Sequence, residues 1–170
     1  MALVTSQSTL PNFDYEYHTI NVDTLGQASK NTFSVYIQQP LKNVVQARLV
    51  SAKINTTLVS NVCYVSIEEL NTQFSQRATS DLEGQTNLLK LNNSFGSIMS
   101  ANTLPLVFRD EYPIVHQYIT PIKKVSRLTV SLLDQTGGTI PGEDLDNFLT
   151  LQFICRKPNL SGEADTRRAK

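Results

Sequence analysis

The stretch Val44-Val-Gln-Ala-Arg-Leu-Val-Ser-Ala-Lys-Ile54 lies in the longest β-type run of the chain. The apolar residues stand on odd positions in Val45, Ala47 and Leu49, and on even positions in Val50, Ala52 and Ile54. Because side chains of a strand alternate between faces, this switch requires an extra residue or a change of sheet. Two explanations stay open: a strand that crosses between the sheets of a sandwich at a corner, and a strand buried on both faces.

Similar runs rich in Val, Ile, Leu, Tyr, Phe and Thr fill most of the chain, and turn-forming residues separate them. The clearest cover residues 33–37, 44–54, 62–70, 125–133 and 148–154, with a first strand near 13–22 and shorter candidates at 95–99, 104–108 and 114–119. We expect Pro40 to end the second strand, because proline cannot donate to a central ladder. No run of comparable length keeps a 3.6-residue apolar period.

About eight antiparallel strands in two four-stranded sheets predict an all-β fold, the eight-stranded single jelly-roll sandwich. An immunoglobulin-like sandwich competes, but its Cys…Trp…Cys signature cannot occur in a chain without Trp.

The 170 residues suit one domain, which we place at residues 13–158. Residues 1–12 read as a flexible arm and residues 159–170 as a polar tail, because neither has an apolar period. Residues 71–94 are the least strand-like and predict an exposed, insertion-like loop region. In an assembly, we expect at least one terminal segment to become ordered along neighbouring subunits or an inner layer.

The charge balance argues against a polyanion as partner. The chain has 15 basic and 15 acidic residues and a net charge of +0, so no long-range attraction to nucleic acid or acidic membrane is expected. Only 18% of the residues are charged, below the usual quarter. Such a surface suits a protein covered by its neighbours, and it also suits many extracellular β-sandwiches.

Motifs for chemistry are sparse. Neither phosphate-loop pattern occurs, and His18 and His116, the only histidines, cannot fill the coordination shell of a metal. The acidic pairs read as solvated charges rather than as a calcium loop: Glu68-Glu69, Asp110-Glu111 and Asp144 with Asp146. We therefore predict no catalytic, cofactor-binding or metal-binding residues, no small-molecule substrate and no enzymatic activity.

The two cysteines, Cys63 and Cys155, each lie in an apolar run, so we expect small buried hydrophobic residues and a reducing compartment rather than a disulfide framework. The first residues lack a basic region and a sustained apolar region, and no apolar run approaches a membrane span. We expect neither a signal peptide nor a transmembrane segment.

The stretch Asp134-Gln-Thr-Gly-Gly138 predicts a structural turn that reverses the chain between the last two strands. A turn of this length needs a residue at positive φ, and Gly137 or Gly138 supplies it. The interface residues of any assembly cannot be read from the sequence.

Two longer stretches resemble a known family. Residues 41–56, with the Asn43-Val44 step and the ending Ser51-Ala-Lys-Ile54, resemble a strand and turn of small jelly-roll capsid proteins from large double-stranded DNA viruses and virophages. Residues 122–140 and 146–153 look like the closing pair of strands of that family, with Leu133-Asp-Gln-Thr-Gly137 in the turn between the two strands. The likeness covers most of residues 13–156.

The resemblance implies a structural virion protein, the penton, which forms a homopentamer at the five-fold vertices among neighbouring major capsid proteins. Internal minor capsid proteins are possible further partners, and the location would be the virion, after synthesis in the host cytoplasm. The family has no catalytic residues to transfer. The alternative is a carbohydrate- or receptor-binding β-sandwich of a viral fibre or tail, which would favour exposed aromatic platforms.

Overall fold

A computed structural model describes residues 14–57, 62–71, 91–92, 94–99, 105–142 and 145–158. The predicted arm (1–12), the predicted tail (159–170) and nearly all of the predicted loop region (71–94) lie outside these residues.

The described residues form one curled antiparallel sheet, which confirms the all-β class. Its strands are β1 (Tyr15–Asp23), β2 (Thr32–Ile54), β3 (Val62–Ile67), β4 (Gly96–Met99), β5 (Leu106–Leu133) and β6 (Phe148–Arg156), and a 3-10 helix, η1 (Glu68–Leu70), follows β3. The strand order is β1-β6-β2-β5-β3-β4. Six continuous strands stand where the sequence predicted about eight, because several predicted runs join within β2 and β5.

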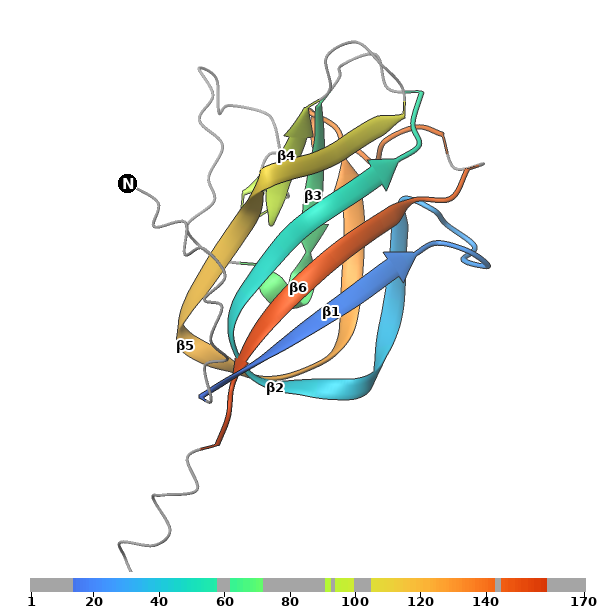
Figure 1. The fold of residues 1–170 in the computed structure, drawn as a ribbon. Helices are drawn as coiled ribbons and strands as arrows, with labels where there is room; N and C mark the ends of the chain where they lie inside the picture. Colours follow the sequence, from blue (N-terminus) through green and yellow to red (C-terminus); the bar gives the residue numbers. More distant parts are fainter. Residues whose placement is uncertain are drawn as a thin grey trace, which may run out of the picture.

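The curl comes from β2 and β5, which bend and contribute to two layers (Figure 1). Residues 32–36 of β2 pair with residues 127–131 of β5, and β3 continues that layer on the other side of β5. Residues 44–54 of β2 instead lie between β6 and the first half of β5. The front layer is therefore β1, β6, the second half of β2 and the first half of β5. The back layer holds the remaining halves with β3 and β4.

The bends coincide with gaps in the β2–β5 ladder. Residues 37–40 separate the pairs Tyr36–Arg127 and Leu41–Val125, and residues 118–121 separate the pairs that Gln46 and Val44 make with β5. Each gap ends on a proline, Pro40 or Pro121. Proline has no N–H to donate, so a ladder gap accommodates it. The expectation that Pro40 ends the strand is wrong, because β2 continues through the bend.

The change of apolar face at Leu49–Val50 is a β-bulge. Both ladders of β2 shift register between Leu49 and Ser51, so Val50 is an extra residue against β6. The inner side chains are Ala47 and Leu49 before the bulge, and Ala52 and Ile54 after it. The strand changes layer at residues 37–44, well away from this switch.

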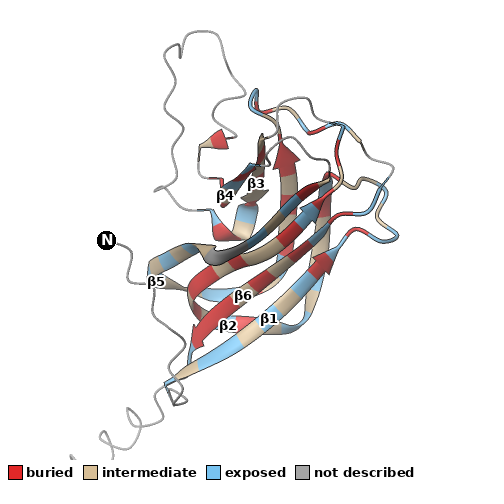
Figure 2. Ribbon diagram, turned by 45° about the horizontal axis from the view of Figure 1, so that its top comes forward, coloured by how far each residue is buried: buried red, intermediate tan, exposed pale blue. Residues whose placement is uncertain are grey.

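The core lies between the two layers, where buried side chains alternate along the strands (Figure 2). The alternation predicted for residues 62–67 and 125–133 is confirmed, with Cys63, Val65 and Ile67 buried on β3 and Leu128, Val130 and Leu132 buried on β5. β1 contributes less, since only Val22 of its side chains is fully buried. Among the described residues, no helix has the length and apolarity to cross a bilayer.

Candidate functional site: a polar junction and the outer face of the front layer

The predicted glycine turn is present, and Gly137 is the residue that needs to be glycine. Of the two glycines, only Gly137 has a positive φ, +78°. The Asp134 carboxylate accepts hydrogen bonds from the Thr136 N–H (2.7 Å), the Thr136 hydroxyl (2.7 Å) and the Gly138 N–H (3.0 Å). Burial opposes ionisation of Asp134, but these bonds outweigh it and lower the pKa of the carboxyl.

The sequence predicted that this turn reverses the chain between two paired strands. That prediction is wrong, because β5 and β6 do not pair. Thr139 forms a single bridge with Leu133, and the Ile140 N–H donates to the Leu132 carbonyl at 3.1 Å. The chain then passes to the other layer, where β6 lies between β1 and β2. Sequence neighbours thus belong to different layers here.

The two histidines share one cross-strand row but lie apart. His18 pairs with Phe153, Phe153 with Ala47, and Ala47 with His116. Three inter-strand spacings separate the histidines by about 14 Å, too far to ligate one ion. His116 contacts the Phe95 carbonyl. Within the described residues, no group of three His, Cys, Asp or Glu side chains gathers in a way that suits a metal.

The prediction that the acidic pairs are solvated charges is wrong for Glu69, whose carboxylate is engaged in hydrogen bonds. Its carboxylate accepts from the Thr129 N–H (2.7 Å), the Thr129 hydroxyl (2.9 Å) and Arg127 (3.3 Å). Burial disfavours the charged form, but these donors prevail and lower the pKa of Glu69. The pairing of β3 with β5 ends at Ile67–Val130, so Glu69 satisfies the next β5 amide. The side chains of Asp110, Glu111 and Asp144 lie outside the described residues.

A polar junction ties the loops together at one end of the sandwich. Its buried members are Thr24, Asn31 and Asn147, and its more exposed members are Lys30, Asn55 and Asp146. Asn147 is its centre and is 1% exposed. Its side-chain amide donates to the Lys30 carbonyl (2.8 Å) and the Asn31 side-chain oxygen (3.0 Å), and its oxygen accepts from the Asn55 N–H (2.7 Å). Its own N–H donates to the Thr24 hydroxyl at 2.9 Å.

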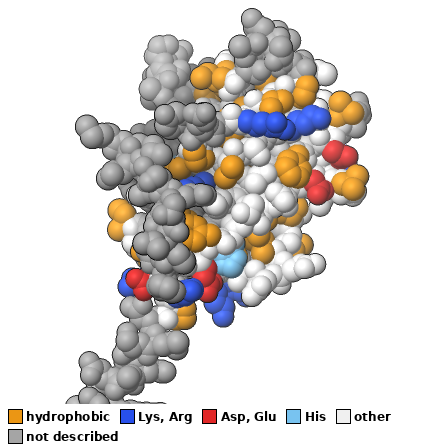
Figure 3. Space-filling model, in the orientation of Figure 1, with side chains coloured by type: hydrophobic (Ala, Val, Ile, Leu, Met, Phe, Trp, Pro, Cys, Tyr) orange, Lys and Arg blue, Asp and Glu red, His pale blue; other side chains and the backbone are white. Residues whose placement is uncertain are grey.

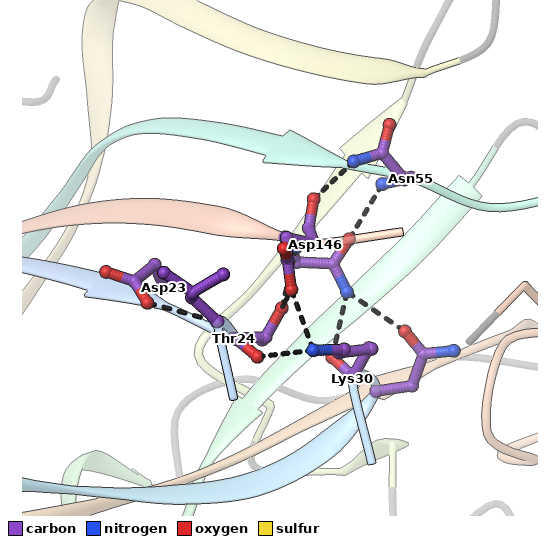
Figure 4. Close-up of polar contacts among 8 residues, drawn as sticks. Asp23, Thr24, Lys30, Asn55 and Asp146 are labelled. Atoms are coloured by element: carbon purple, nitrogen blue, oxygen red, sulfur yellow. Dashed lines mark hydrogen bonds and ion pairs between the residues drawn. The ribbon is translucent and has the colours of Figure 1, made fainter. Parts of the chain in front are cut away.

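Three further contacts, made by Lys30 and Asn55, extend the junction (Figure 4). The Lys30 ammonium donates to the Thr24 carbonyl and forms an ion pair with Asp146, both at 2.8 Å. Donation by Lys30 lowers the pKa of the Asp146 carboxyl. The Asn55 side-chain amide donates to the Asp146 carbonyl. In the described residues, no fully buried side-chain N or O atom is left without a hydrogen bond.

The junction is a structural site, and none of its residues was predicted as a site residue from the sequence. Asn31, Asn55 and Asn147 each adjoin a strand, and that position was their only sequence signal. Their side chains converge only because the two layers bring three loops to the same end.

Both cysteines are free and buried, as predicted. Burial raises the pKa of the Cys63 thiol to about 12 and also raises the pKa of Cys155. Neither thiol has the lowered pKa of a reactive cysteine.

The outer face of the front layer is a regular grid of cross-strand rows. Its central rows are Thr19–Gln152–Arg48–Val115 and Asn21–Thr150–Ser51–Arg109, and the flanking rows are Tyr17–Ile154–Gln46–Gln117 and Asp23–Phe148–Lys53–Val107. Only Arg48, Lys53, Arg109 and Asp23 carry charge. Figure 3 shows a band of Lys and Arg across the upper part of this face. Tyr17 and Val107 are 57% and 50% exposed.

Comparisons with known proteins add no relative. The chain matches no family model, and no curated protein matches it either.

Proposed function

We propose that this chain is a structural capsid protein whose single jelly-roll domain assembles into a ring, as a penton does at a five-fold vertex. The observation that supports it most is the division of β2 and β5 between two layers. Counting each half separately gives the four-stranded layers β1-β6-β2-β5 and β2-β5-β3-β4. Eight antiparallel strands in two such layers are the jelly-roll arrangement.

The surface chemistry supports an assembly role. Twelve of the 16 side chains in the outer grid of the front layer are uncharged: seven are Thr, Asn, Gln or Ser and five are apolar or aromatic, with Gln46 and Ile154 already buried. Such a face can lose its water at smaller cost than a charged face, because burying an unpaired charge is far more expensive than burying a satisfied polar group. Contacts within a closed ring are heterologous, and each must bury about 1,000 Å² or more to persist.

Oligomeric state and location in a particle test the proposal. We expect the purified full chain to form a pentamer in analytical ultracentrifugation and native mass spectrometry. Particle imaging should place it at five-fold vertices, in contact with the major capsid protein. A location elsewhere in the shell would remove the penton assignment and leave a minor capsid role. A chain that stays monomeric at all concentrations and is missing from particles would overturn the whole proposal.

The alternative, a carbohydrate- or receptor-binding sandwich, needs aromatic side chains gathered on one surface. Tyr17 and Tyr36 are exposed, at 57% and 79%. Tyr17 belongs to the outer face of the front layer, whereas Tyr36 pairs with Arg127 in the back layer. They form no common platform, so the alternative gains no support from them.

A further inference from the structure

Among the described strands, β1 pairs with β6 alone, and this open edge of β1 differs from the other long edge of the front layer. β1 pairs with β6 through nine consecutive residue pairs, Tyr15–Arg156 to Asp23–Phe148, without a register shift. At the opposite edge, β5 departs from register with β2 between residues 109 and 114 and contains Pro113. Bulges and prolines protect a sheet edge from pairing with another chain. β1 contains no proline, lysine or bulge.

The hydrogen-bond pattern shows which backbone groups β1 presents. The Lys157 N–H donates to the Asp14 carbonyl (2.9 Å), and the Thr24 N–H donates to the Asn147 carbonyl (3.2 Å). Bonded pairs alternate in an antiparallel ladder, so the even-numbered residues of β1 face β6. The odd-numbered residues direct their N–H and C=O groups toward the open edge: Tyr15, Tyr17, Thr19, Asn21 and Asp23.

We propose that this edge is a docking site for the N-terminal arm, residues 1–13, of a second copy of this chain. The arm would add as a strand to β1, so that main-chain hydrogen bonds supply the affinity. The inference rests on the proposed self-assembly and identifies the contact between neighbouring subunits. In a ring, each subunit would pass its arm to the next.

The length and composition of the arm suit this edge. Thirteen extended residues span about 40 Å, whereas a nine-residue strand covers about 30 Å, so the arm can cover the edge with several residues left to bridge two subunits. Residues 1–13 contain no charged side chain and include Leu3, Val4, Thr5 and Thr9. Side chains of an added strand would therefore not be repelled electrostatically by Glu16 or Asp23.

The chain's own arm fits the edge poorly. To fold back onto β1, it would have to reverse within residues 11–13, immediately before Asp14, which the β6 ladder already engages. Hairpin loops of two or three residues need a residue at positive φ, usually glycine. The loop would consist of Pro11, Asn12 and Phe13, of which only Asn12 tolerates that conformation, so the whole reversal would depend on this one residue. A neighbouring copy avoids this reversal.

The substitution Thr19→Pro tests whether assembly needs the open edge of β1. Thr19→Ala is its matched control. Proline removes the N–H that faces the open edge and leaves the β1–β6 bonds of the even-numbered residues intact, while alanine keeps the N–H. We expect Thr19→Pro and deletion of residues 2–12 each to raise the concentration for half-assembly at least tenfold, with Thr19→Ala close to wild type. The deletion changes no described residue, so it serves if Thr19→Pro fails to fold.

Disulfide trapping identifies the occupant. Chains with a cysteine at Thr5, Ser6 or Gln7 and a C-terminal tag are mixed with untagged chains that carry Asn21→Cys. We expect a mixed disulfide dimer of intermediate mass for at least one arm position. A third chain carries both the arm cysteine and Asn21→Cys. A disulfide that forms only within this chain, with no mixed dimer, would show that the arm binds its own subunit and would overturn the inference.

The remaining outcomes separate the two proposals. If rings form equally well with Thr19→Pro and with the arm deletion, the edge inference fails and the capsid proposal stands. If the arms exchange but no ring forms, the edge inference stands and the ring proposal fails. A monomer without any mixed disulfide would overturn both.

Discussion

The two ends of the sandwich change layer by different means. At the lower end in Figure 1, which we call the corner end, β2 and β5 bend through ladder gaps that end on Pro40 and Pro121. At the loop end, the chain crosses in loops that the buried amide of Asn147 ties together. The corner end thus depends on backbone geometry within continuous strands, whereas the loop end depends on specific side-chain hydrogen bonds. We therefore expect the loop end to be the more sensitive to mutation.

The largest effect should come from Asn147→Asp. This nearly isosteric change removes both side-chain donors and leaves the Lys30 carbonyl and the Asn31 oxygen facing a buried carboxylate. Each buried group left unsatisfied costs about 1–3 kcal/mol, so we expect a loss of roughly 3 kcal/mol or more in the free energy of unfolding. Urea denaturation measures it, with the exposed Thr19→Ala as control. A loss below about 1 kcal/mol would show that water replaces the junction without penalty.

Gly137→Val should follow. A β-branched residue at φ +78° is strained, and we expect a loss of about 2 kcal/mol, together with weaker assembly. Gln135→Ala in the same turn should change stability by less than about 0.5 kcal/mol, because its side chain is exposed. Thermal unfolding of both variants tests the pair. Equal melting temperatures would mean that the turn is not under conformational constraint.

The corner end offers a matched test at Asn43, the only described non-glycine residue with a positive φ, +52°. Asparagine tolerates this conformation, and valine does not, so Asn43→Val should cost about 1 kcal/mol. Asn43→Gly should lie within about 0.5 kcal/mol of wild type. Urea denaturation of both variants checks this. A larger loss for Asn43→Gly than for Asn43→Val would show that the Asn43 side chain, rather than its backbone, stabilises the corner.

The smallest effect should be the pH dependence contributed by Asp134. Its pKa is lowered in the folded chain, so its contribution is present above the ordinary Asp pKa of about 3.9 and is lost as the pH falls through the folded value. The group is partly exposed, so the contribution should stay below about 1 kcal/mol. We expect Asp134→Asn to lose less thermal stability than wild type between pH 6 and pH 3. The same loss in both proteins would mean that this carboxylate does not stabilise the turn.

Local sequence signals predicted the strands well, but predicted the chain's path poorly. The alternation in residues 62–67 and 125–133 reports which side chains face the core, because every second residue of a strand points the same way. Whether a strand continues or ends cannot be read from this alternation. Pro40 is compatible with an ending and with a ladder gap, and only the pairing with β5 distinguishes them. The turn at Gly137 was predictable for the same local reason, whereas the partner of β6 was not.

The sequence by itself determined the all-β class, the change of apolar face at Leu49–Val50, the burial of Cys63 and Cys155, and the need for glycine in the turn at residues 134–138. Each of these depends on residues close together in the chain. Only the tertiary structure decided that β6 lies between β1 and β2, that Asn31, Asn55 and Asn147 meet, and that no second described strand pairs with β1. Those features join segments about 90 or more residues apart, and side-chain periodicity carries no information about such distant partners.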